Sequence, residues 1–111
     1  REKLPKHTRV KRRDTNHYEI TRAFEACGFT VIDTSQVAGF VDIVVGRRGL
    51  NFLIEIKDGS KPPSSRKLTP MEEDFHRDWR GQAHIINSVR EVIRFSELSY
   101  QIVPLGNVGN H

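Results

Sequence analysis

Apolar residues recur along the chain with two different periods, and these periods predict seven secondary-structure elements. Spacings of three and four predict helices over residues 14–26, 70–80 and 88–95. Short runs rich in β-branched residues predict strands over 29–33, 40–45, 51–57 and 84–86. The order helix, strand, strand, strand, helix, strand, helix favours an α/β fold in which helices flank a mixed central sheet as three layers.

Polar residues spaced as capping boxes mark where the helices begin. The pairs are Asn16 with Glu19, Thr69 with Glu72, and Ser88 with Glu91. Pro70 at the first helical position makes the second helix start the clearest. Within that helix Met71, Phe75 and Trp79 recur at every fourth position, which predicts a stripe packed in the core.

Composition limits the class of protein. The chain has 111 residues, 36% of them hydrophobic and 29% charged, which is typical of one soluble globular domain. Its single cysteine excludes an internal disulfide and a cysteine-based zinc site. The sequence has no apolar run near the ~20 residues that a membrane helix needs, so we expect no membrane partner.

Charge is concentrated at the beginning of the chain. Residues 1–13 contain seven basic residues and one acidic residue, whereas the whole chain has a net charge of +4, so residues 14–111 carry −2. We interpret 1–13 as a basic arm and 14–111 as a single domain. Such an arm favours a polyanionic partner, because neutralised phosphates release counterions, although a solvated tail explains it equally well.

Two carboxylates interrupt strands that are otherwise apolar. Asp42 lies within 40–45, and Glu55 and Lys57 lie two residues apart in 51–57, so the latter two point to one face. Charges in such positions are costly unless they are paired, exposed or metal-bound. If residues 46–49 form the hairpin link, Val45 pairs with Leu50, and Asp42 becomes the diagonal neighbour of Glu55 at roughly 7–8 Å. Two carboxylates on one face at this separation can hold one hard cation.

Asp42, followed on the next strand by Glu55-Ile56-Lys57, resembles the active site of the PD-(D/E)xK nuclease superfamily. More narrowly, the chain is similar to the small stand-alone VRR-NUC domains of bacteriophages and prophages. The matching segments are 13–17 with Glu19, 39–42, 55–64, 68–70, 75–76 and 79–82. Two positions depart from the family pattern: Val41 stands where proline is usual, and Glu72 stands where we expect glutamine. Glu72 either adds an acid to the site or only caps its helix.

The resemblance implies a restriction-endonuclease-like α/β/α core and an endodeoxyribonuclease that depends on Mg²⁺ or Mn²⁺ and on no small-molecule cofactor. It implies that Asp42, Glu55 and the carbonyl of Ile56 hold the metal. Lys57 would orient the attacking water or stabilise developing charge, and Glu19 would supply a further carboxylate. Stand-alone members are similar to Holliday-junction resolvases that act as homodimers. The expected partners are therefore branched DNA and a second copy of the chain. The expected location is the cytoplasm of a bacterial host.

Basic residues near the catalytic strand are the expected contacts to the DNA backbone. They are Lys61, Arg66 and Lys67 in the loop after that strand, and Arg12 and Arg13 in the arm. His17 and His76 could contact phosphate, but exposed helix histidines are more often surface residues, so we expect both to be surface residues.

Other functions stay open on the sequence alone. A nuclease for flaps, single strands or duplex DNA would carry the same residues. A non-catalytic nucleic-acid-binding module of the same fold, or a subunit of a larger assembly, would also fit the basic arm.

Overall fold

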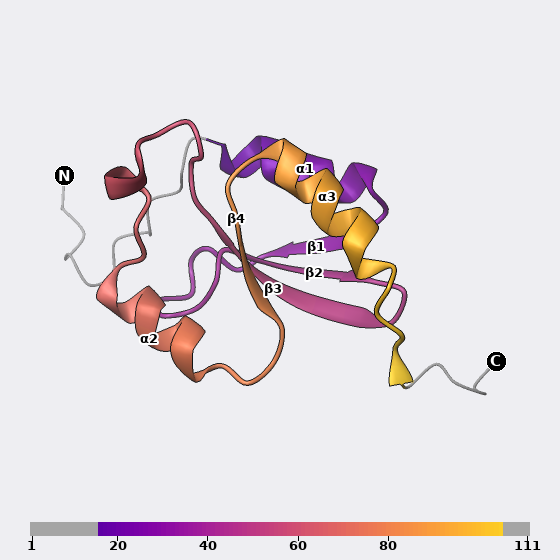
Figure 1. The fold of residues 1–111 in the computed structure, drawn as a ribbon. Helices are drawn as coiled ribbons and strands as arrows, with labels where there is room; N and C mark the ends of the chain where they lie inside the picture. Colours follow the sequence, from indigo (N-terminus) through magenta and orange to yellow (C-terminus); the bar gives the residue numbers. More distant parts are fainter. Residues whose placement is uncertain (1–15, 106–111) are drawn as a thin grey trace, which may run out of the picture.

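The computed structural model describes residues 16–105, so the predicted arm, with Arg12 and Arg13, lies outside the described residues. The elements are α1 (His17–Ala26), β1 (Thr30–Asp33), β2 (Ile43–Arg47), β3 (Leu50–Ile56), the short 3₁₀ helix η2 (Pro63–Ser65), α2 (Pro70–Asp78), β4 (Ala83–Ile86) and α3 (Val89–Ser99) (Figure 1). Apart from η2, the order is the predicted one, and the α/β class is confirmed. Within the described part of the chain, no helix is both long enough and apolar enough to cross a bilayer.

The four strands form one mixed sheet in the order β1-β2-β3-β4. β1, β2 and β3 are antiparallel neighbours, while β4 lies parallel to β3. The parallel pair requires a crossover, and this crossover contains η2 and α2.

The β2–β3 hairpin is tighter than the sequence predicted. Arg47 pairs with Leu50, so the turn contains only Arg48 and Gly49, both with positive φ (58° and 79°), as a two-residue type I′ turn requires. Val45 therefore pairs with Phe52, and the predicted pairing with Leu50 was wrong by two residues. A shift of two leaves every side chain on its predicted face.

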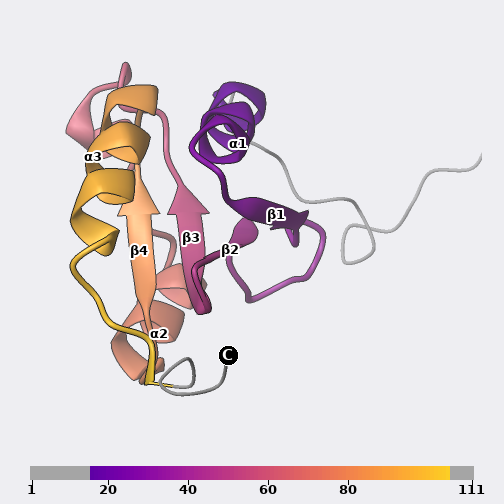
Figure 2. The ribbon, with the colours of Figure 1, turned by 90° about the vertical axis from the view of Figure 1, so that its right-hand side faces the viewer.

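The apolar core lies between the sheet and the pair α1 and α3, which run side by side over one face (Figures 1 and 2). Phe24, Phe52 and Phe95 meet edge to face in this core, with ring centroids 4.9–5.9 Å apart between contacting pairs. Ile54 and Ile56 of β3 are buried in it. Since neighbouring strand residues point to opposite faces, Glu55 and Lys57 point away from the core and toward α2.

Helix α2 covers the other face, and it buries no residue completely. Met71 and Trp79 are 59% and 44% exposed, so the prediction of a core stripe was wrong. The reason is that α2 meets the sheet through its polar face. His76 lies against Glu55 of β3, and Glu72 lies against the charged residue that directly follows this strand. Phe75 makes an edge contact with Phe40 (5.6 Å between centroids) and stacks on Trp79.

The helix starts differ in how far they follow the predicted capping boxes. At α2 the reciprocal bonds between Thr69 and Glu72 are both present. Asn16 makes no side-chain cap, and its amide instead donates to the main-chain carbonyls of Lys57 and Asn87 at 3.0 Å each. Asn16 therefore ties the beginning of α1 to the ends of β3 and β4. Ser88 caps α3, although the carboxylate of Glu91 accepts from the amide of Asn87.

Candidate active site

The sheet brings Asp42 and Glu55 side by side. Asp42 lies just before β2, and its amide donates to the carbonyl of Ile54 at 3.1 Å. The amide of Ile56 in turn donates to Asp42 Oδ2 at 2.7 Å. The carboxyl of Asp42 is thereby held against β3, where it is hydrogen-bonded to the carboxyl of Glu55. Ile43 pairs with Ile54, and continuing this register by one residue sets Asp42 directly opposite Glu55, where the sequence predicted a diagonal arrangement.

Glu55 is the most buried acid of this site, with only 2% of its surface exposed. Burial, the hydrogen bond to Asp42 and the negative charges of Asp42 and Glu72 together raise the pKa of Glu55 to about 9. At neutral pH the Asp42–Glu55 pair therefore holds a proton. A cation placed between the two carboxylates would remove the repulsion that keeps this proton bound.

Lys57 forms an ion pair with Glu72, with 2.8 Å between Nζ and Oε1. Both side chains are largely covered, at 12% and 15% exposure. The same Oε1 atom accepts from the amide of Thr69 at 2.8 Å. Burial alone would raise the pKa of Glu72, but the hydrogen bonds from Lys57 and Thr69 outweigh it, so its pKa lies below the usual value. Glu72 thus caps its helix and also places an acid beside Lys57, the two roles between which the sequence left a choice.

His76 lies one helical turn after Glu72, and its Nε2 is 3.7 Å from Glu55 Oε1. Its side chain is mostly covered. His17 on α1 is also buried, with its Nε2 3.5 Å from Asp33 Oδ2, so the expectation of surface histidines was wrong for both. Burial lowers its pKa, which favours the neutral ring. Nε2 is buried without a hydrogen-bond partner among the described residues. The spacing of four between Glu72 and His76 was the signal that both side chains share one face of α2.

The donor set fits a magnesium-type ion better than a closed metal cage. Among residues 16–105 there is no cluster of three or more histidine, cysteine, aspartate or glutamate residues arranged to hold a metal. Mg²⁺, however, is commonly held by one or two carboxylates, with waters and substrate phosphates completing its shell. Asp42 and Glu55 supply that pair, and burial together with the neighbouring negative charges raises the pKa of Glu55.

The structure places Glu19 elsewhere. It is exposed on α1 and lines a depression of about 300 Å³ together with Asn16, Asp58, Ser60, Asn87 and Ser88. Three residues before Glu19, Asn16 donates to the carbonyl of Lys57, which connects the beginning of α1 to the end of β3. A catalytic part for Glu19 stays a prediction.

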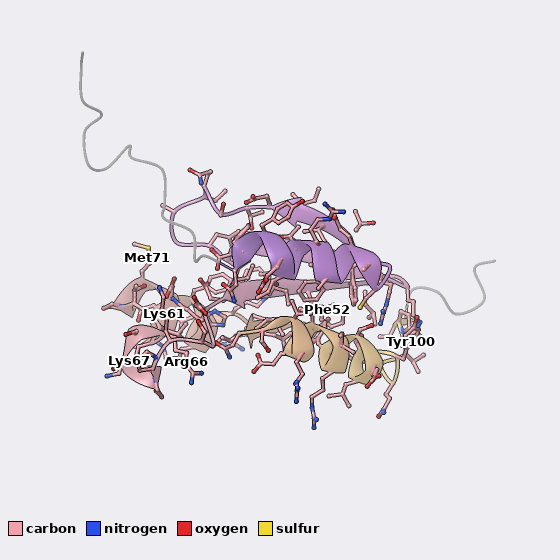
Figure 3. The ribbon with its side chains drawn as sticks, turned by 90° about the horizontal axis from the view of Figure 1, so that it is seen from above. Phe52, Lys61, Arg66, Lys67, Met71 and Tyr100 are labelled. Carbon is pink, nitrogen blue, oxygen red and sulfur yellow. The ribbon has the colours of Figure 1, made fainter. Side chains whose placement is uncertain are left out.

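The predicted DNA contacts in the loop after β3 lie near the beginning of α2. Lys61 and Lys67 are exposed, and Arg66 is half-buried, with its Nε donating to the carbonyl of Lys61 at 3.0 Å. Figure 3 shows these three residues at the same end of the molecule as Met71. Their position allows contact with a phosphate backbone that passes over α2.

Comparison of the chain with family models, with curated proteins and with solved structures finds no significant match. The resemblance to VRR-NUC domains therefore depends on the residues alone.

Proposed function

We propose that the chain is a metal-dependent DNA endonuclease of the VRR-NUC type within the PD-(D/E)xK superfamily. One observation carries this proposal: Asp42, Glu55 and Lys57, which come from neighbouring strand segments, all belong to one buried polar cluster beneath α2. A sheet that needed these residues only for stability would gain little from packing two acids against each other.

Asp42, Glu55 and the carbonyl of Ile56 would hold the metal. When bound, Mg²⁺ or Mn²⁺ supplies charge relief at the phosphoryl oxygens and lowers the pKa of the attacking water. Ionisation of Glu55 accompanies metal binding, since its proton and the cation compete for the same oxygens. Lys57 would donate to a phosphoryl oxygen and stabilise the negative charge that develops there.

The carboxylates are covered, so α2 has to shift before a phosphate reaches them. Asp42 and Glu55 are 6% and 2% exposed. Helix α2 packs over them without burying any of its own residues, and the Lys57–Glu72, Glu55–His76 and Phe40–Phe75 contacts are among those that hold it, so it is less firmly packed than a helix with a buried apolar face. A phosphate would replace Glu72 as the partner of Lys57.

The substrate class follows from the charges and from the resemblance. Lys61, Arg66 and Lys67, with Arg12 and Arg13, would contact the DNA backbone, which favours recognition of DNA shape. Branched DNA such as a four-way junction is the substrate that we infer. A homodimer would supply two sites for paired nicks, and the bacterial cytoplasm is the compartment where phage DNA is processed.

The decisive experiment is nicking of an immobile four-way junction by the whole chain with Mg²⁺, Mn²⁺ or chelator. We expect cutting with either metal, none with chelator, and a loss of at least 100-fold for Glu55→Gln and Lys57→Ala. Glu97→Gln, an exposed change on α3, is the matched control and should cut like the parent. Flaps, single strands and linear duplex in the same panel assign the substrate.

Two outcomes would overturn the proposal. Strand scission that persists in Glu55→Gln would place the chemistry elsewhere. Tight DNA binding without scission, unaffected by metal, would identify a non-catalytic nucleic-acid-binding module. The homodimer is tested separately by light scattering with and without junction DNA, and a monomer in both states would exclude it.

A further inference from the structure

We infer that the exposed aromatic face of α2 is a stacking site for one unpaired nucleobase of the DNA substrate. This face consists of Met71 and Phe75 of α2 and of Trp79, the residue that directly follows the helix, and with Gly39, Asp74 and Asp78 it lines a pocket of about 310 Å³. The volume lies at the lower end of the range for small-ligand pockets, about 300–1,000 Å³, which suits a ligand the size of one base. The inference rests on the proposed nuclease function and specifies its substrate.

Trp79 is held in place although it is 44% exposed. Its indole stacks on the ring of Phe75, with centroids 5.2 Å apart and an angle of 20° between the planes. Gly81 lies against the edge of the indole so closely that a Cβ at this position would be 2.8 Å from Trp79 Nε1. An aromatic ring that is fixed in position and still open to solvent can stack on a base without losing side-chain freedom.

The rim of the pocket carries hydrogen-bond acceptors that match a base. Arg77 donates to Asp74 at 3.0 Å and to both carboxylate oxygens of Asp78 at 2.9 and 3.1 Å, which fixes both acids and neutralises one of their charges. Carboxylates accept from the amino groups of cytosine, adenine and guanine. The pocket therefore offers an apolar stacking surface with polar acceptors at its edge, whereas phosphate binding is left to the basic residues before α2.

The position of the pocket connects it to the candidate active site. His76, which contacts Glu55, is the neighbour of Phe75 in α2, and Trp79 follows three residues later. At a rise of 1.5 Å per residue this is about 5 Å along the helix axis. A base stacked on Trp79 would thus lie about one helical turn from His76, the α2 residue that contacts Glu55.

This arrangement selects DNA with an unpaired base. In an intact duplex the bases are stacked inside the helix and cannot reach Trp79, whereas a junction centre, a flap or a single strand exposes them. The stacking site would therefore favour DNA in which a base is unpaired, and it would depend little on which base that is.

Trp79 is the only tryptophan of the chain, so its fluorescence reports on this pocket alone. We expect a six-nucleotide single strand, added in chelator, to quench Trp79, and an abasic strand of the same length to leave the emission unchanged. Equal effects of the two strands would overturn the inference. Emission that changes with protein concentration and not with DNA would overturn it too, because it would assign this face to a second copy of the chain.

Substitution provides the second test, with binding measured by anisotropy of a labelled single strand. Trp79→Leu should weaken binding about 5- to 100-fold, and Trp79→Phe should restore most of it. Tyr18→Leu removes an even more exposed aromatic residue from α1, in the other helix layer, and should have no effect. Unchanged affinity in Trp79→Leu would contradict the stacking site.

These measurements need no metal, so they separate the stacking site from the nuclease activity. If the chain stacks bases but never cuts DNA, the proposed nuclease function is refuted. If it cuts DNA but its fluorescence is not quenched, only the stacking site is refuted.

Discussion

Lys57 and Glu72 form an ion pair of 2.8 Å that connects the residue directly after β3 to the first turn of α2. Glu72 accepts the bond with the same oxygen that receives the amide of Thr69, so one side chain fixes both the beginning of the helix and its place over the sheet. The stability of α2 and the setting of Lys57 are therefore linked through Glu72.

This double role predicts that the effect of changing Glu72 depends on the replacement. Glutamine can still close a capping box with Thr69 and accept from Lys57, whereas alanine can do neither. Glu72→Ala should lower the free energy of unfolding by about 2–4 kcal/mol, and Glu72→Gln by about 1 kcal/mol. Urea unfolding monitored by circular dichroism measures both values. Equal losses would show that the charge of Glu72 alone is what matters.

The second prediction concerns pH. The pKa of Glu55 is raised from 4.5 to about 9, so the native state binds more protons than the unfolded state between these values. The free energy of unfolding should therefore fall as pH rises from about 5 to about 9, by roughly 1–3 kcal/mol. Glu55→Gln, which stays neutral, should flatten this dependence. Unfolding measured at a series of pH values tests this prediction, with Glu97→Gln as the control. If the free energy of unfolding of Glu55→Gln fell with pH as steeply as that of the parent, the prediction would be wrong.

The third prediction is that divalent metal stabilises the fold through the acid pair. Mg²⁺ at ten times its dissociation constant should raise the free energy of unfolding by about 1.4 kcal/mol. The effect should grow from pH 6 to pH 9, because the proton on Glu55 competes with the ion. Thermal unfolding with Mg²⁺ or chelator measures it, and Asp42→Asn should abolish it. A gain that persists in Asp42→Asn would place the ion elsewhere.

The sequence was sufficient for the element order and for the face shared by Asp42, Glu55 and Lys57. Both follow from local periodicity, and the two-residue error in the hairpin register left the faces intact because side chains alternate with a period of two. The register itself depends on Arg48, which adopts a positive φ that few residues other than glycine accept. The predicted link, residues 46–49, has a glycine at each end. Nothing in this pattern indicates that only residues 48 and 49 form the turn.

The sequence was insufficient where a side chain bonds to a distant part of the chain. Asn16 is spaced as a helix cap, yet its amide bonds to carbonyls 41 and 71 residues away. The stripe of Met71, Phe75 and Trp79 has the period of a buried helix face, but α2 turns its polar side to the sheet because Glu55 and Lys57 need partners. The periodicity of a helix predicts that it has an apolar face and a polar face, but it does not predict which of the two packs against the sheet.

Arg47 gives the last prediction, which concerns the end of the sheet away from the acids. Its guanidinium donates to the carbonyls of Cys27 and Ser96 and to the hydroxyls of Ser96 and Ser99, at 2.7–3.0 Å. It also lies 4.1 Å from the ring centroids of Phe29 and Tyr100. Lysine has the charge but neither the fork of donors nor the flat face. Arg47→Lys should therefore lower the free energy of unfolding by about 2–3 kcal/mol.

The neighbouring Arg48 supplies the matched control. It is exposed, donates to the carbonyl of Ser99 at a long 3.4 Å and makes a cation–π contact with Tyr100. Arg48→Lys keeps the charge and the Cβ at the same positive φ, so the free energy of unfolding should change by less than about 0.5 kcal/mol. Similar losses in both variants would mean that charge near Tyr100, and not the set of bonds made by Arg47, holds the hairpin against α3. Because Arg47 lies outside the acid cluster, metal-induced stabilisation should persist in Arg47→Lys, which separates the stability of the fold from that of the site.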